Sequence, residues 1–173
     1  MPEIDLKNFI RDIPDFPKPG ILFKDITPLL KDAQALDTAI RILAEKFQSE
    51  KIDYVVGIES RGFIFGAALA TALGAGFIPV RKKGKLPYKT RQVTYDLEYG
   101  QDTLEIHEDA LSAGDRVLII DDLLATGGTV NAVITLLKGC RVQIVSFACV
   151  VELAFLNGRD KVTDVPVYSM IQF

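Results

Sequence analysis

One segment in the second half of the chain constrains the fold more than any other. Four apolar residues occupy Val117–Ile120, the acids Asp121 and Asp122 come next, and Ala-Thr-Gly-Gly-Thr fills positions 125–129. A short, wholly apolar run is typical of a strand buried on both faces, and Thr129–Leu137 has the apolar spacing of a helix. The segment therefore predicts a central strand, two carboxylates at its end, a glycine-rich turn and a helix.

The same alternation of strands and helices runs along the chain. Helices are expected over Asp37–Lys51, Phe63–Leu73 and Thr129–Leu137. Strands are expected over Asp53–Ile58, Phe77–Val80, Thr103–His107, Arg116–Ile120, Val142–Val151 and Val165–Ile171. This order favours an α/β fold with a mostly parallel, twisted sheet flanked by helices. Ligands bind such sheets beyond the carboxyl ends of the strands. A site is therefore expected in the loops after Ile58, Val80, Ile120 and Val151.

Two segments fall outside this alternation. The first 30 residues are rich in proline, and Asp15–Gly20 cannot be the interior of a regular helix. We expect this segment to be an arm packed on the core or a cap over a ligand site. Arg81–Tyr95 is polar and basic, and we expect a long loop there. Its basic residues also allow a solvated face or a nucleic-acid patch.

The stretch from Gly62 to Val80 has no charged residue and is long enough for a membrane span. Gly74, Gly76 and Pro79 interrupt it, so we interpret it as a buried helix, a turn and a buried strand.

Composition excludes several classes of protein. With 173 residues, 49% of them hydrophobic, and a net charge of -3, the chain suits one folded domain rather than a disordered segment. A pI near 5.2 argues against a generally basic nucleic-acid binder. Cys140 and Cys149 are too few for a disulfide scaffold and fit buried positions in a reducing cytosol. No secretory signal is expected at the N-terminus.

The glycine-rich turn has the chemistry of a phosphate cradle. Gly127 and Gly128 let the backbone approach a ligand, free amides at a helix N-terminus attract an anion, and Thr126 and Thr129 add hydroxyl donors. The neighbouring acids suit sugar hydroxyls or a hydrated Mg²⁺. Taken singly, the glycines could form only a turn and the acids a helix cap. The G-x-x-x-x-G-K-[ST] and G-x-G-x-x-G motifs are absent, which argues against a P-loop NTPase and a Rossmann dehydrogenase.

Segment 117–129 resembles the motif with which type I phosphoribosyltransferases bind 5-phosphoribosyl-1-pyrophosphate (PRPP). Further segments resemble the members of that family that use adenine, namely residues 16–28, 59–63, 81–87 and 95–100. The resemblance implies the type I phosphoribosyltransferase fold as a single domain over 1–173, with a small N-terminal hood that binds adenine over 1–30 and a flexible loop over 81–100. It also implies transfer of ribose 5-phosphate from PRPP to N9 of adenine, which gives AMP and pyrophosphate in purine salvage. Mg²⁺ would be held mainly by PRPP and water, with no direct protein ligand.

The resemblance also implies residue roles. The ribose and 5′-phosphate would bind Asp121, Asp122, Ala125, Thr126, Gly127, Gly128 and Thr129. Pyrophosphate would bind Arg61, Arg81 and Lys85, adenine would bind Leu22, Lys24 and Leu153, and Glu98 would be the catalytic acid/base. A cis peptide bond is implied near Glu59–Ser60. On the residues alone, a surface ion pair for Arg61, an exposed acid for Glu98 and core packing for Leu22 and Leu153 remain alternatives. The family most often has Arg where this chain has Lys24.

We expect a cytoplasmic homodimer that binds neither nucleic acid nor membrane. Two other functions remain as alternatives. One is a phosphoribosyltransferase for hypoxanthine, guanine or xanthine, against which the N-terminal arm and residues 97–100 argue. The other is a non-catalytic PRPP sensor that regulates transcription, against which the acidic charge and Glu98 argue.

Overall fold

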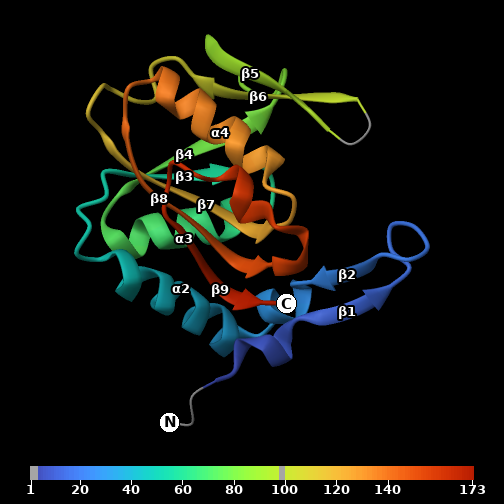
Figure 1. Ribbon diagram of the computed structural model, residues 1–173. Coiled ribbons are helices and arrows are strands. Elements are labelled where there is room, and N and C mark those ends of the chain that lie inside the picture. The colour runs from blue at the N-terminus through green and yellow to red at the C-terminus, as the bar shows by residue number, and fades with distance from the viewer. Residues whose placement is uncertain (1–3, 98–99) are drawn as a thin grey trace.

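The computed structural model describes residues 4–97 and 100–173 and has helices on both faces of a seven-stranded sheet (Figure 1). The sheet order is β5-β6-β4-β3-β7-β8-β9. Its strands are β3 (Tyr54–Ile58), β4 (Gly76–Lys82), β5 (Thr90–Asp96), β6 (Gln101–His107), β7 (Arg116–Leu124), β8 (Gln143–Glu152) and β9 (Val167–Gln172). The five strands from β4 to β9 in this order are parallel, and β5 and β6 form an antiparallel hairpin at one edge. The predicted α/β class is confirmed.

Helices and short turns fill the connections. The helices are α1 (Thr27–Lys31), α2 (Ala33–Phe47), α3 (Gly62–Leu73) and α4 (Gly128–Gly139). Single 3₁₀ turns are η1 (Leu6–Phe9), η2 (Ala154–Leu156) and η3 (Gly158–Lys161). In the described part of the chain, no helix combines the length and apolar character that crossing a membrane requires.

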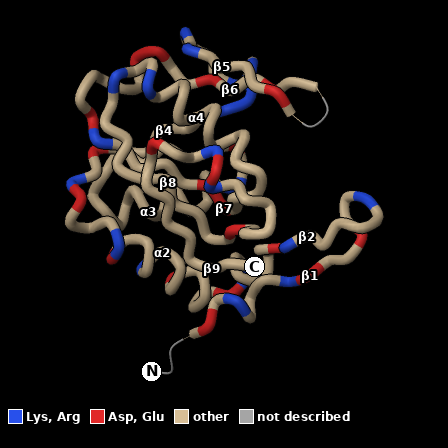
Figure 2. Tube along the Cα trace, in the orientation of Figure 1, with Lys and Arg blue, Asp and Glu red and all other residues tan. Residues whose placement is uncertain are grey.

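Apolar side chains on the two faces of the central strand β7 contribute to two separate hydrophobic cores. Val117 and Ile119 face α4, whereas Leu118 and Ile120 face α2 and α3, because successive side chains of a strand point to opposite faces. All four are fully buried. The trace of α3 carries no charge (Figure 2), and it covers the sheet beside α2. The uncharged stretch is therefore a buried helix, a turn at Gly74 and strand β4, as predicted.

The strand order places a crevice between β3 and β7. The chain passes from β3 to its neighbour β4 on one side, and later enters β7, β8 and β9 on the other. A sheet has its ligand crevice at such a reversal, beyond the carboxyl ends of the two strands. Residues 59–61 follow the end of β3, and Asp121 and Asp122 lie in the carboxyl-terminal half of β7.

Three sequence-based boundaries need correction. Residues 81–95 are not one long loop, because β4 continues to Lys82 and β5 begins at Thr90, pairing with β6 over its whole length. Strand β7 does not end at Ile120, because Leu123 and Leu124 still pair with β8. Helix α2 begins at Ala33, where Asp32 caps it by accepting the N–H of Ala35 at 2.8 Å, and ends at Phe47 rather than Lys51.

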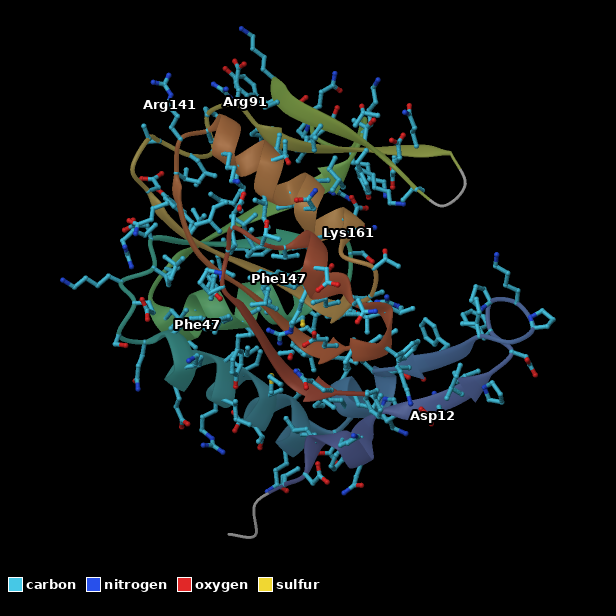
Figure 3. All side chains as sticks on the ribbon, viewed as in Figure 1. Asp12, Phe47, Arg91, Arg141, Phe147 and Lys161 are labelled. Carbon is cyan, nitrogen blue, oxygen red and sulfur yellow. The ribbon has the colours of Figure 1, made fainter. Side chains whose placement is uncertain are left out.

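The N-terminal arm forms a second, two-stranded sheet. Strands β1 (Arg11–Pro14) and β2 (Leu22–Asp25) pair in antiparallel register, joined by a turn in which Gly20 has a φ of +86°. Arg11 holds the base of this hairpin through Asp25, at 2.6 Å. The hairpin and the β5–β6 hairpin extend to the same side of the molecule (Figure 1). Figure 3 shows Asp12 on the arm, away from Phe147 in the sheet and Phe47 in the helical layer.

Candidate active site

The glycine-rich turn joins β7 to α4. Gly127 has a φ of +81°, a left-handed conformation that favours glycine, and a Cβ there would meet the carbonyl of Gly158. Helix α4 begins at Gly128, so its first N–H groups have no acceptor within the helix. The adjoining recess has a volume of about 100 Å³ and is lined by Asp121 and residues 123–130. Free amides and the helix dipole make this recess suitable for a small anion.

The two acids lie inside β7 and have different surroundings. Asp122 is buried, and its Oδ2 lies 2.7 Å from Nε of Arg61. Oδ1 of Asp121 accepts the N–H of Asp122 at 2.8 Å. Burial raises the pKa of the Asp121 carboxyl well above its ordinary value, and the charge of Asp122 beside it raises that pKa further. A carboxyl group accepts hydrogen bonds and, when protonated, can also donate one, so this pair is suited to binding hydroxyl groups.

Glu59, at the end of β3, forms ion pairs with the basic residues Arg81 and Lys85 at the end of β4. Its carboxylate, with 7% of the side chain exposed, accepts from Nζ of Lys85 at 2.5 Å, the N–H of Lys82 at 2.9 Å and Nε of Arg81 at 3.3 Å. Burial alone would raise the pKa of Glu59, but these donors lower it to about 2. The peptide bond from Glu59 to Ser60 is cis, as the resemblance implied.

A recess of about 470 Å³ lies over this cluster. Its walls are Glu59, Ser60, Arg61, Lys82, Lys85, Asp121, Asp122 and Thr129. Arg61 and Lys85 were expected here. Arg81 does not line the recess; its guanidinium contacts Glu59 and the carbonyl oxygen of Lys85 instead. Lys82 lines the wall although the sequence did not single it out. Adjacent basic residues look alike in sequence, and only the pleat of β4 decides which one faces the recess.

The largest cavity at this end of the sheet, about 800 Å³, lies between the two hairpins. Its walls are Gly20, Ile21, Leu22, Asp96, Leu97, Thr126, Gly128, Thr129, Leu153, Phe155, Leu156 and Lys161. Leu22 is 48% exposed, so core packing is excluded for it. Apolar walls with a few polar groups are typical of a site for a flat organic ring.

The three recesses adjoin one another around Thr129, which lines all of them. Its hydroxyl also lies 3.3 Å from that of Tyr95 on β5. The arrangement therefore offers an apolar slot, a cradle of amides and a cationic recess around two carboxylates, within reach of one small molecule.

Lys24 is expected at the adenine pocket, but its side chain lies elsewhere. Nζ of Lys24 pairs with Asp12 at 2.5 Å and lies 3.9 Å from the ring centroid of Phe173, so the lysine head group does not line the large cavity. Glu98 lies outside the described residues.

Besides Lys82, sequence reasoning missed other residues that the structure brings to the site. Glu59 and Ser60 stood within a recognised segment but received no role, and nothing local shows that a carboxylate will gather three donors. Phe155 and Lys161 follow β8 in two short 3₁₀ turns. The rule that sites lie beyond strand ends pointed to this loop after Val151, but the pattern could not select residues within it.

Comparisons with known proteins agree with this geometry. The profile of the phosphoribosyl transferase domain family matches residues 26–171. An adenine phosphoribosyltransferase of Trichodesmium erythraeum is 58% identical over 170 residues, covering 98% of this chain and 100% of that protein. The crystal structure of adenine phosphoribosyltransferase from Thermoanaerobacter pseudethanolicus superposes with a TM-score of 0.93 at 52% identity, covering 97% and 98% of the two chains. The Saccharomyces cerevisiae enzyme, in a complex containing adenine, has a TM-score of 0.90 at 44% identity, covering 95% and 96%.

Proposed function

The chain belongs to the phosphoribosyl transferase family, and we infer from that membership that it transfers the 5-phosphoribosyl group of PRPP to N9 of adenine, giving AMP and pyrophosphate in purine salvage. One structural observation carries the inference. The three recesses around Thr129 match the three parts of the reacting complex in chemistry: apolar walls for a purine, amides for a terminal phosphate, and cations for a pyrophosphate.

We propose that the cradle of Ala125, Thr126, Gly127, Gly128 and Thr129 binds the 5′-phosphate. This group does not react, so its binding energy fixes the position of the ribose for the chemical step. Asp121 and Asp122 then bind the ribose hydroxyls. The negative charge that this acidic pair carries also favours the positive charge that develops on the ribose as the bond to pyrophosphate breaks.

In this proposal the cationic recess binds the leaving pyrophosphate. Arg61 and Lys85 line it and supply the positive charge, and Lys82 joins them. Arg81 lies outside the recess and acts indirectly through Glu59, whose Oε2 lies 3.3 Å from Nε of Arg81. These cations stabilise the negative charge that develops on the leaving group.

The adenine ring would lie between Leu22 and Leu153 in the large cavity, with main-chain groups of Leu22 and Lys24 at its polar edge. Because the side chain of Lys24 is engaged with Asp12, the replacement of the more usual Arg leaves this main-chain contact unaffected. Glu98 remains a proposed acid/base for the proton on the base.

Magnesium is part of the same proposal. The described residues contain no group of three or more His, Cys, Asp or Glu side chains that could hold a metal ion. In this proposal Mg²⁺ is held mainly by PRPP and water, and the hydrated ion lies near Asp121 and Asp122 on the wall of the cationic recess. When bound with PRPP, Mg²⁺ would neutralise charge on the leaving pyrophosphate.

A turnover assay tests the function. The purified protein receives PRPP and Mg²⁺ with adenine, hypoxanthine, guanine or xanthine separately, and nucleotide and pyrophosphate are measured. We expect AMP from adenine and little product from the other bases. Turnover of guanine but not adenine would overturn the base assignment, and binding of PRPP without turnover of any base would favour a sensor.

We further propose that the protein is a cytoplasmic homodimer. Helix α3 exposes Ile64, Ala67, Ala68, Thr71 and Ala72, a face without charge that directly follows Arg61. A second copy that covers this face would bury it. Light scattering after size exclusion should give twice the chain mass for the wild type and a smaller mass for Ala68→Glu. A monomeric wild type would refute the dimer.

A further inference from the structure

The segment after β8 contacts two parts of the proposed site at once. Its residues Leu153, Phe155 and Leu156 form one wall of the large cavity, and Lys161 completes that wall beside α4 (Figure 3). The middle of the segment, at Gly158, packs against the turn that carries Gly127. A change in its position would therefore alter the base pocket and the phosphate cradle together.

The contact between the two loops leaves no room for a side chain on either. A Cβ on Gly127 would meet the carbonyl of Gly158, and a Cβ on Gly158 would meet the carbonyl of Ala125. Gly127 also has a positive φ, whereas Gly158 does not. Alanine at 158 would thus introduce a clash without backbone strain, which makes this position the cleaner one to test.

Arg159 fixes the segment from behind. Its Nε and Nη2 donate to the two carboxylate oxygens of Glu152 at 2.6 and 2.7 Å, and Nη1 donates to the carbonyl of Val167 at 3.1 Å. Glu152 has 4% of its side chain exposed and also accepts from the hydroxyl of Ser169 at 2.5 Å and the amide of Gln172 at 3.1 Å. Hydrogen bonds from Arg159 lower the pKa of Glu152 despite its burial. The fork thus ties the segment to the ends of β8 and β9.

We propose that Arg159 is a positioning residue of the transferase site: through Gly158 it sets the phosphate cradle, and through residues 153–156 it sets the wall of the base pocket. Arg159 lines none of the three recesses, so its effect on substrates is indirect. The inference rests on the proposed function. Lysine keeps the positive charge but cannot donate to both carboxylate oxygens of Glu152 as Arg159 does. Arg159→Lys therefore tests the hydrogen-bond geometry at constant charge.

The experiment compares Arg159→Lys and Gly158→Ala with two matched controls. Arg41→Lys changes an exposed ion pair on α2, and Gly139→Ala adds a Cβ at the end of α4 where nothing lies within 4 Å. The KM for PRPP, the KM for adenine, kcat and Tm are measured for each variant. A merely structural role would lower Tm and the amount of active enzyme, with both KM values unchanged.

We expect Arg159→Lys to raise both KM values by about tenfold, because small misplacements of binding groups have effects of this order or larger. Gly158→Ala should raise the KM for PRPP by about tenfold and the KM for adenine by less, because its Cβ meets the cradle loop. The double variant should fall short of the product of the single effects, since both changes displace one loop. KM values equal to those of the controls would overturn the proposal.

If the wild type turns over no base, the proposed function is refuted. The positioning role can then still be tested by ligand binding. Calorimetric titration with AMP should then give weaker binding for Arg159→Lys and Gly158→Ala than for the controls. Equal dissociation constants, or a wild type that does not bind AMP, would overturn the inference.

Discussion

Replacing Glu59 by Gln tests the cation cluster at the ends of β3 and β4 most directly. Glutamine keeps the size of the side chain but removes the charge that holds Lys85, Arg81 and the N–H of Lys82. The cluster joins two loops distant in sequence, so its loss should lower the stability of the whole domain.

The magnitude follows from the pKa of Glu59. A fall from the ordinary 4.5 to about 2 corresponds to roughly 3 kcal/mol of stabilisation at neutral pH, at about 1.4 kcal/mol for each pH unit. Lys85 is 49% exposed, so solvent screening reduces this to about 1–2 kcal/mol. Because the pKa is lowered in the native state, the stabilisation is complete above pH 4.5 and is lost as the pH falls through about 2.

Urea unfolding of the wild type and Glu59→Gln measures this difference at several pH values. We expect the variant to be less stable by about 1–2 kcal/mol at pH 7, with a gap that narrows steadily below pH 4.5. Glu45→Gln is the matched control, because the i,i+4 pair of Glu45 with Arg41 is exposed on both sides and should contribute only about 0.3–0.5 kcal/mol. Equal stability of Glu59→Gln and wild type at pH 7, or a gap that stays constant down to pH 3.5, would refute the reasoning.

Three further predictions concern the chemistry. Glu98→Gln should lower kcat by about a hundredfold or more, as loss of a general acid/base does, with little change in Tm; unchanged kcat in the turnover assay would remove Glu98 from the mechanism. Chelation of divalent cations by EDTA should abolish AMP formation and added Mg²⁺ should restore it, whereas full activity in EDTA would contradict the proposed role of the metal. Burial raises the pKa of the Cys149 thiol far above its ordinary value, so a thiol reagent should leave Cys149 unmodified in the native protein and label it once urea unfolds the chain; rapid native labelling, located by mass spectrometry, would show that the burial is wrong.

The local elements of the centre of the site could be predicted from sequence. An apolar run before Asp121 and Asp122, then two glycines and a helical pattern, are all short-range signals, and the structure has the strand, turn and helix in that order. The turn at Gly74 and the buried helix before it follow from the same kind of signal.

The strand boundaries predicted from sequence were wrong where backbone pairing continues past the apolar residues of a strand. The segment containing Arg91 is polar and was assigned to a loop, yet it forms β5, because backbone hydrogen bonds to β6 do not require apolar side chains. Strand β7 likewise continues through the polar Asp121 and Asp122 to Leu124, because β8 pairs with this stretch.

The sequence by itself determined the alternating α/β class and the chemistry of the cradle, because both depend on residues close together along the chain. Only the tertiary structure decided that Lys82 rather than Arg81 faces the cationic recess, that Lys24 turns to Asp12, and that Glu59 and Arg159 contact the loops near that recess. These choices depend on which strands lie side by side and on which side of each strand a residue falls. That information arises when distant segments pack together, and no local pattern of residues contains it.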